Sequence, residues 1–411
     1  MSILSLSSKQ QNIVRIVLAT LVGLAFVFEL IRDCQRDGDF MGYINAGNAV
    51  INQTHIYADY LNTWPPFFAI FSVPLAWGHA VSPIIIRLIW LIGIIVSWYF
   101  IAKWTVRIST GSTLTFKPTN ENARIWFLDW RVFLPFLFVL RFIIDDLSNI
   151  QINSFILLSC LYAIHCYLHE RHITAGIILG IIISLKVYPI FLLFFFVYKR
   201  AYKTTAISLL IIGLTTLISL LIFGWDVGVQ YYTDWIQNKA MGETILTHKN
   251  QSIFPWFEGL LTDQSRGLDI RYNVLSLTAA WSKKITYIVI GSAALYIAWL
   301  FRKGNSRYSV VGQFAFVLAA IPILSPLAWK YYFVFLFPLL FIQFNYLLQT
   351  RTKGVTRLLF IVSIALAILS TDGLLGVWFS DVLEVFGCVT WATILLLVSY
   401  LVQEKGMAHT D

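Results

Sequence analysis

Charged residues are scarce in this chain, and their scarcity excludes a water-soluble globule. Asp, Glu, Lys and Arg make up only 12% of the 411 residues, whereas 58% are hydrophobic, and the mean hydropathy is +0.74. Soluble domains are about 25% charged. A helix needs roughly 20 apolar residues to cross a bilayer, and such runs recur along the sequence. We therefore predict an all-α polytopic membrane protein.

The sequence also lacks the patterns of a disulfide framework or a metal centre. Its four cysteines are Cys34, Cys160, Cys166 and Cys388, and they form no CxxC pair. Three of them lie inside apolar runs, so neither disulfides nor a zinc site is expected. His55, His165, His169 and His172 show no metal-ligand spacing with acidic residues. We therefore expect no metal and no cofactor. The first apolar run has no small-residue cleavage motif after it and is expected to be a retained span.

The apolar runs predict a single integral membrane domain over 1–411, with about 11–13 transmembrane helices. The candidate spans are 13–32, 83–103, 131–145, 150–168, 173–185, 188–198, 204–224, 284–301, 308–324, 330–349, 355–371 and 385–402. One further apolar piece, 66–78, contains prolines and is short for a span. It is either re-entrant or a short tilted crossing, and in either case we expect it to line a cavity. Lys186 and Pro189 predict a break between the spans 173–185 and 188–198.

Basic residues gather between the spans, which predicts the cytoplasmic side of an inner (plasma) membrane protein. These clusters also account for the net charge of +9, so no nucleic-acid partner is expected. The opposite side holds 33–65, 225–271 and 372–384, which we expect to face the periplasm or another non-cytoplasmic space. The clusters are Lys103, Arg107, Lys117, Arg124 and Arg131; Lys199, Arg200 and Lys203; Arg302, Lys303 and Arg307; and Arg351, Lys353 and Arg357.

Polar residues recur at the non-cytoplasmic ends of the predicted spans, and their convergence on one side indicates a functional site. Each has an alternative reading. An acid just past a helix is most often a cap or a solvated end, Gln and Asn bond neighbouring membrane helices, a lysine can extend its charge to the interface, and tyrosines populate the interfacial layer. The residues are Asp37, Asp39, Asp145, Asp146, Gln151, Asn153, Lys186, Tyr188, Asn250, Gln251, Ser252, Lys330, Tyr331 and Tyr332.

Such a set suits sugar transfer from a lipid-linked donor. A polyprenyl-phosphate leaving group needs cations and hydrogen-bond donors rather than a proton. The acceptor hydroxyl needs one general base, which a positioned Asp can supply. Glycosidases typically need two carboxyl groups across the scissile bond. Membrane-level aromatic residues would accommodate the lipid.

Five segments, in order, resemble the polyprenol-phosphate-dependent mannosyltransferases of glycosyltransferase family 87. They are GDFMGYINAGNAVINQTHIYADYLNTWPPFFAIFSVPLA (38–76), NIQIN (149–153), AGIILGIIISLKVYPIFLLFFFVYKR (175–200), NQS (250–252) and SPLAWKYYFVFLFPLL (325–340). The resemblance implies a GT-C-type bundle with short outer interfacial helices. It also implies an active site on the non-cytoplasmic face. The implied donor is a polyprenyl-phosphate sugar, usually mannose, and the implied acceptor is a glycan or glycolipid.

The resemblance further implies an inverting displacement with a first-loop Asp as general base. By position this is Asp39, with Asp37 as the second candidate. The chain departs from the family in two places: the glycine of the second segment is Ile150, and the His of the last segment is replaced. The residues that the matched segments nominate for substrate binding are Tyr43, Asp146, Gln151, Asn153, Lys186, Tyr188, Asn250, Gln251, Trp329, Lys330 and Tyr331.

Two other functions stay open at this point. A transporter or flippase of lipid-linked sugars would use similar polar groups, but the sequence shows no matching broken helices in two halves. A surface-polysaccharide polymerase or ligase would be expected to carry several arginines in a large outer loop. The loop 225–271 has only Arg266 and Arg271.

Overall fold

A computed structural model describes residues 7–59, 62–118, 123–240, 242, 244–302, 307–349 and 354–407, with the backbone alone for 307–308 and 404–407. Lys303, Arg351 and Lys353 of the basic clusters lie outside the described residues, as does the side chain of Arg307.

Apolar helices dominate the described chain, which confirms the all-α polytopic membrane fold. Five are long and apolar enough to cross a membrane, and a sixth span is possible where α18 and α19 meet at a bend of 56°. The five are α1 (Ser8–Asp33), α5 (Pro83–Thr110), α10 (Tyr202–Phe223), α13 (Ala279–Phe301) and the continuous pair η3 (Lys330–Leu336) and α15 (Phe337–Gln349). The bent pair is α18 (Val377–Val385) and α19 (Cys388–Met407).

Shorter elements fill the space between these spans. The shorter apolar helices are α3 (Pro66–Phe71) with α4 (Val73–Val81), α7 (Asn153–Leu168), α8 (His172–Leu185), α14 (Arg307–Leu324) and α16 (Gly354–Leu369). The remaining elements are α2 (Phe40–Ile51), β1 (Thr113–Thr115), β2 (Arg124–Trp126), α6 (Trp130–Ser148), α9 (Ile190–Tyr198), α11 (Trp225–Asp234), the π-helix η2 (Trp235–Ala240), α12 (Ile253–Leu261) and α17 (Asp372–Leu375). The two strands form a small parallel pair at the end of α5.

The helices α8 and α10 approach each other closely through glycines. A Cβ at Gly176 would lie 2.7 Å from the Thr204 carbonyl oxygen, and one at Gly180 would lie 2.8 Å from the Ser208 carbonyl oxygen. Ser208 Oγ also donates to the Gly176 carbonyl at 3.1 Å. Small residues at i and i+4 let membrane helices pack backbone to backbone. This contact fixes the helix whose end carries Lys186.

The predicted break after α8 is confirmed. The helix ends at Leu185, Lys186 adopts an extended backbone conformation with φ −150° and ψ 116°, and α9 begins after Pro189. A proline lacks the N–H that a continuous helix would use. The break therefore leaves Lys186 and Tyr188 on a short non-helical segment inside the bundle.

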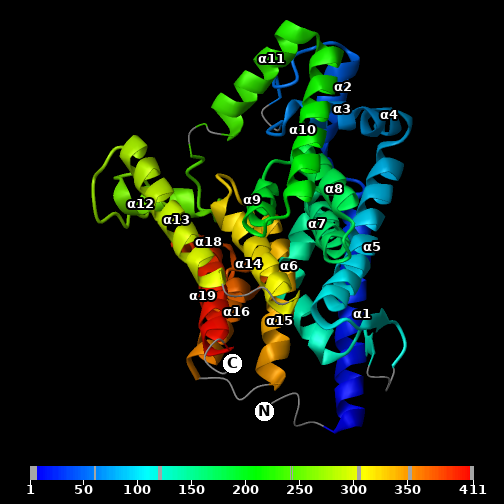
Figure 1. Ribbon diagram of the computed structural model, residues 1–411, viewed down its shortest axis with the longest axis vertical. Helices are drawn as coiled ribbons and strands as arrows, with labels where there is room; N and C mark the ends of the chain where they lie inside the picture. Colours follow the sequence, from blue (N-terminus) through cyan, green and yellow to red (C-terminus); the bar gives the residue numbers. More distant parts are fainter. Residues whose placement is uncertain are drawn as a thin grey trace.

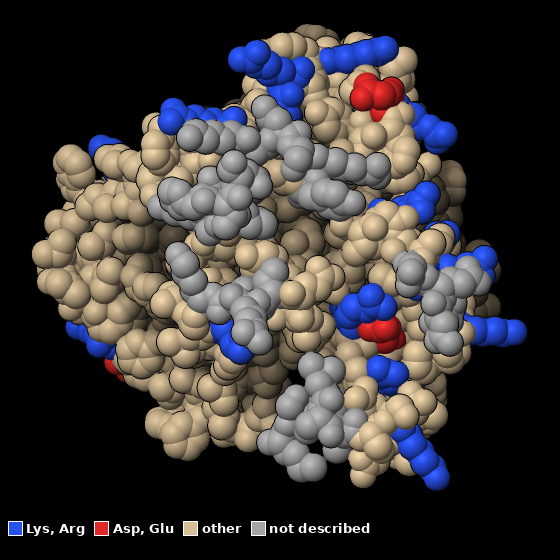
Figure 2. Space-filling model, turned by 60° about the horizontal axis from the view of Figure 1, so that its bottom comes forward, with Lys and Arg blue, Asp and Glu red and all other residues tan. Residues whose placement is uncertain are grey.

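The two ends of the molecule differ in character. In Figure 1, α2, α3, α4 and α11 lie together at the upper end, and the chain termini lie at the lower end. The segment 66–78 forms α3 and most of α4. It packs against α2 so closely that a Cβ at Gly47 would lie 2.4 Å from the Ser72 carbonyl oxygen. Lys and Arg side chains surround the lower end, with few acidic ones among them (Figure 2).

Candidate active site

Asp39 directly precedes α2, at the position where an acid commonly caps a helix. Its side chain makes no capping hydrogen bond. Instead Asp39 Oδ2 accepts from Gln151 Nε2 at 2.8 Å and from Tyr331 Oη at 3.4 Å. Gln151 Oε1 in turn accepts from Tyr43 Oη at 3.1 Å. Gln151 and Tyr331 thus bond the partly buried Asp39 carboxylate directly, and Tyr43 is linked to it through Gln151. These contacts do not fit a simple helix cap.

A second polar network lies beside the first and is centred on Asn153. Asn153 Nδ2 donates to Asp146 Oδ1 at 2.9 Å, while Asn153 Oδ1 accepts from Lys186 Nζ at 3.0 Å and from Tyr188 Oη at 2.9 Å. The other carboxylate oxygen of Asp146 accepts from the backbone N–H and hydroxyl of Ser154. Both carboxylate oxygens of Asp146, near the end of α6, therefore accept hydrogen bonds from the first residues of α7. Asp146 thereby orients the Asn153 amide that holds Lys186.

The ammonium group of Lys186 connects the two networks. Its Nζ lies 4.7 Å from the centre of the Tyr332 ring, and that ring stacks on Tyr331 at 5.4 Å. Cations over aromatic faces gain electrostatic stabilisation. The side chain is almost fully buried, so its charge is held inside the bundle rather than extended to the interface.

The electrostatic surroundings of Asp39 favour a base stronger than an ordinary aspartate. Partial burial raises the pKa of Asp39 because it penalises the charged form, and the hydrogen bond from Tyr331, the charge of Lys186 and the hydrogen bond from Gln151 oppose this rise. The net shift of the pKa is upward. A carboxylate with a raised pKa accepts a proton more readily at neutral pH.

The turn before α7 aims Gln151 and Asn153 at the two networks. Ile150 has φ +51°, a left-handed conformation that costs an L-residue about 1–2 kcal/mol. This is the position where the resembling family has glycine, which adopts such a φ without strain. The Ile150 side chain is fully buried in the core. Its burial helps to offset the backbone strain, which explains how the substitution is tolerated.

Asp37 is held elsewhere. Its carboxylate is exposed and pairs with the buried guanidinium of Arg87 on α5. The described residues show no hydrogen bond from Asp37 to Asp39, Gln151 or Tyr331. The pair instead attaches the loop before α2 to α5.

Asn250 and Gln251 organise backbone rather than the carboxylate network. Asn250 Oδ1 accepts from the Ala328 N–H at 3.0 Å, and Gln251 Oε1 accepts from the Val389 N–H at 3.2 Å. Arg266, which sequence reasoning missed, donates to the Asn250 carbonyl at 2.6 Å and to the Val385 carbonyl at 2.9 Å. These bonds join the loop before η3 to the bend between α18 and α19.

The segment Trp329–Tyr332 divides its side chains between two places. Tyr331 and Tyr332 face the networks around Asp39 and Lys186. Trp329 is half-buried and packs against the core. Lys330 forms an ion pair with the fully buried Glu384 of α18. Glu384 was also missed, because an acid in the acidic stretch 372–384 gives no signal of a buried partner.

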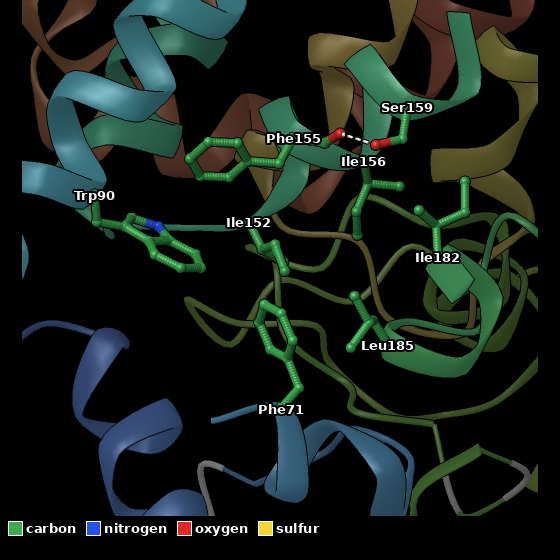
Figure 3. Close-up of a pocket in the computed structure, with 8 residues that line it drawn as sticks. All are labelled: Phe71, Trp90, Ile152, Phe155, Ile156, Ser159, Ile182 and Leu185. Atoms are coloured by element: carbon green, nitrogen blue, oxygen red, sulfur yellow. Dashed lines mark hydrogen bonds between the residues drawn. The ribbon is translucent and has the colours of Figure 1, made fainter. Parts of the chain in front are cut away.

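An apolar cavity of about 230 Å³ adjoins the site (Figure 3). It touches the polar networks through Ile152, which lies between Gln151 and Asn153 in sequence, and through Trp90, whose Nε1 donates to the Gln151 carbonyl at 3.2 Å. Its lining residues are Phe71, Trp90, Ile152, Phe155, Ile156, Ser159, Ile182 and Leu185.

Comparison with known proteins identifies the family. The sequence pattern of glycosyltransferase family 87 matches residues 62–326, more than half of the chain. The match begins after Asp39 and ends before Trp329.

The chain is also similar to a curated protein of Mycobacterium tuberculosis (strain CDC 1551 / Oshkosh), the polyprenol-phosphate-mannose-dependent alpha-(1-2)-phosphatidylinositol pentamannoside mannosyltransferase. The two are 26% identical over 278 residues, which cover 68% of this chain and 57% of the relative. The similarity thus spans little more than half of the relative's length. The length of the family match shows that the chain belongs to glycosyltransferase family 87.

Proposed function

We propose that the protein is a membrane glycosyltransferase that moves mannose from a polyprenyl-phosphate donor to a glycan or glycolipid acceptor. Family membership supports the reaction class, and the activity named for the mycobacterial relative supports the donor. The observation that carries the proposal is the carboxylate of Asp39. It is partly buried, makes no capping bond and is held by Gln151 and Tyr331 beside a buried lysine.

Asp39 is the general base of this reaction. The acceptor hydroxyl attacks the anomeric carbon of the donor sugar, and its proton passes to the Asp39 carboxylate. The bond between the anomeric carbon and the phosphate oxygen breaks at the same time, so that polyprenyl phosphate leaves as an anion. A single displacement of this kind inverts the configuration at the anomeric carbon. The raised pKa of Asp39 suits the transfer of a hydroxyl proton.

The donor binds with its phosphate near Lys186 and its lipid along the apolar cavity. Lys186 is the buried cation of the two networks, and cations stabilise the charge that develops on a leaving phosphate. The cavity adjoins the same networks through Ile152 and Trp90, and its apolar lining suits the first isoprene units. Tyr43, Asp146, Gln151, Asn153, Tyr188 and Tyr331 form the surrounding polar wall.

The reaction takes place on the non-cytoplasmic side of the plasma membrane. α2, which begins directly after Asp39, lies at the upper end of the molecule in Figure 1, whereas Lys and Arg side chains gather at the lower end, near the chain termini (Figures 1 and 2). Basic loops favour the cytoplasmic side. We treat the whole chain as one integral domain, because its largest apolar cluster joins residues from α1 to α19.

The test is an assay of the purified full-length protein in nanodiscs with a panel of polyprenyl-phosphate sugars and candidate acceptors. The measured quantity is the release of polyprenyl phosphate. Release from the mannose donor that depends on Asp39 supports the proposal. No release with any donor, from folded protein, overturns it. Flipping of lipid-linked sugars in liposomes would then test the transporter alternative.

A further inference from the structure

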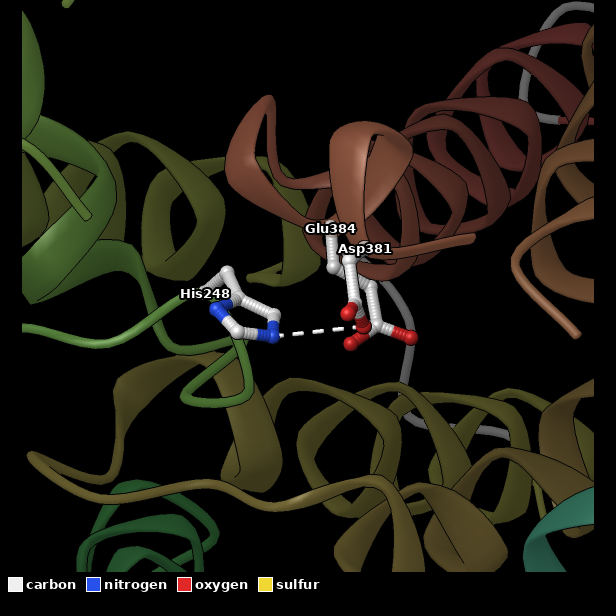
Figure 4. A group of neighbouring side chains, drawn as sticks. All are labelled: His248, Asp381 and Glu384. Carbon is white, nitrogen blue, oxygen red and sulfur yellow. Dashed lines mark ion pairs between the residues drawn. The ribbon is translucent and has the colours of Figure 1, made fainter. Parts of the chain in front are cut away.

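Three potential metal ligands meet near Lys330, the first residue of η3. His248 precedes α12, and Asp381 and Glu384 lie on α18, one turn apart (Figure 4). His248 Nε2 lies 3.2 Å from Asp381 Oδ1. One ligand atom from each of the three residues lies within 4.8 Å of the others. Because His248 lies far from Asp381 and Glu384 in the sequence, no local spacing predicts the cluster.

The cluster contains buried ligand atoms whose bonding is incomplete. Glu384 is fully buried; its Oε1 is taken by Lys330 and by Ser380 Oγ, whereas Oε2 has no hydrogen-bond partner among the described residues. His248 Nε2 is also buried and has no hydrogen-bond partner in the described chain, although it faces Asp381. An unsatisfied buried oxygen of a charged group is costly. A cation between these atoms would satisfy both.

We propose that His248, Asp381 and Glu384 bind one divalent metal ion of the Zn²⁺ or Mn²⁺ type. One imidazole nitrogen and two carboxylate oxygens suit such ions, whereas Mg²⁺ and Ca²⁺ are bound mainly by oxygen ligands. Ligands about 2.0–2.2 Å from a metal are at most about 4.4 Å apart. The observed spacing therefore needs a closure of only a few tenths of an ångström.

The partners around the cluster are those that orient metal ligands. Lys330 and Ser380 hold the first oxygen of Glu384 and leave the second one facing the group. Gln251 donates to the backbone carbonyls of both His248 and Glu384, which holds the loop and α18 together. Such outer partners fix ligand orientation and raise metal affinity. The side chains of His248 and Asp381 remain 17% and 18% exposed, which leaves an entry path.

The net charge of the cluster is negative, so a bound cation would balance it. The two carboxylates carry two negative charges, and the ammonium of Lys330 compensates one of them. Arg141 lies near Glu384 and also near Asp145, whose own charge offsets it. The bound ion would join the loop before α12 to α18. Its ligand Glu384 pairs with Lys330, which precedes Tyr331 in the sequence, and Tyr331 contacts Asp39. Metal binding itself does not depend on the proposed glycosyl transfer.

The experiment measures metal binding directly on the full-length protein in detergent. The protein is stripped with a chelator and titrated with Zn²⁺ by calorimetry and with Co²⁺ by visible absorption. We expect one equivalent to bind with micromolar or tighter affinity and to raise the melting temperature, since ligands that bind the folded state stabilise it. His248→Gln and Asp381→Asn should each weaken binding at least about tenfold.

His172→Gln is the matched control, because it removes a comparable His–carboxylate pair, His172 with Glu170 at 2.8 Å, from another part of the protein. It should bind metal like the wild type. Absence of saturable binding, or equal binding by His248→Gln and Asp381→Asn, would show an ion-pair network only and overturn the proposal. Each variant is checked by gel filtration, and Asp381→Asn replaces His248→Gln if that one does not fold. Because the readout is binding, its failure is distinct from a failure of the transferase assay.

Discussion

Replacing Asp39 with asparagine tests the proposed base with little disturbance of its surroundings. Asn has the same shape as Asp, and its single carbonyl oxygen can still accept the hydrogen bonds from Gln151 and Tyr331 that now reach Oδ2. The variant loses only the negative charge and the ability to take a proton. A positioned general base contributes about 10²–10⁴-fold, or about 2.7–5.5 kcal/mol of barrier. We expect kcat to fall by that factor while donor affinity and folding stay near wild type.

Asp37→Asn is the matched control. It makes the same chemical change two residues away, on an exposed side chain that pairs with Arg87. Asp37 pairs with Arg87 and not with Gln151 or Tyr331 among the described residues, so activity per folded molecule should stay within about threefold of wild type. Because the Arg87 guanidinium is buried, the loss of its counter-charge should lower the melting temperature rather than kcat. The assay is the release of polyprenyl phosphate under single-turnover conditions, with thermal unfolding measured on each variant. If folded Asp39→Asn keeps more than a tenth of wild-type kcat, the base is another group. Equal losses in both variants would assign the effect to the loop.

Three further substitutions and one control probe the surroundings of the base and the helix packing that supports them. Burial raises the pKa of Asp39 and the hydrogen bond from Tyr331 opposes that rise, so Tyr331→Phe should raise it further and shift the acidic limb of kcat/KM to higher pH; an unmoved limb would contradict the contact. Lys186→Met should raise the donor Kd about 10- to 100-fold, because bonds to charged groups contribute about 1.5–3 kcal/mol; unchanged donor binding in an equilibrium assay would remove the phosphate role. Gly180→Ala should lower the free energy of unfolding by about 1–3 kcal/mol, because its Cβ would meet α10. The control Gly213→Ala has open space around it and should be neutral or stabilising by up to about 1 kcal/mol. Equal melting temperatures of the two variants would refute the close packing.

Several features of the fold follow directly from the sequence. Long apolar runs predict membrane helices because the bilayer sets their length, and Pro189 predicts the break after Leu185 because its ring prevents the helical hydrogen bond. The contacts among Asp39, Gln151 and Tyr331 also follow, since polar side chains inside a membrane bundle pair with one another. These inferences use properties that each residue carries wherever it lies in the fold.

Other features depend on partners that a sequence does not display. Asn250 and Gln251 look like substrate ligands, yet the structure has them bonded to the backbone of Ala328 and Val389. An amide bonds a substrate and a main chain through the same atoms, so only geometry separates the two. Lys330 is similar: the matched segment nominates it for substrate binding, and the structure pairs it with Glu384 of α18. The sequence also predicts a span at 188–198, whereas α9 there has only nine residues, fewer than a helix needs to cross a bilayer.

The buried Lys186 and the partly buried Lys330 have different partners, which explains how this chain can depart from its family near Tyr331. Lys186 is held by the neutral amide of Asn153 and by the face of Tyr332. The carboxylates of Asp39 and Asp146 act on its charge without a direct ion pair among the described residues, so the ammonium can still contact an anion. Lys330 is matched by a buried carboxylate, which leaves little net charge for a phosphate. A substitution at Lys330 therefore acts first on the junction with α18, and only through Tyr331 on Asp39. These partners support the proposal that Lys186 is the cation that stabilises the leaving phosphate.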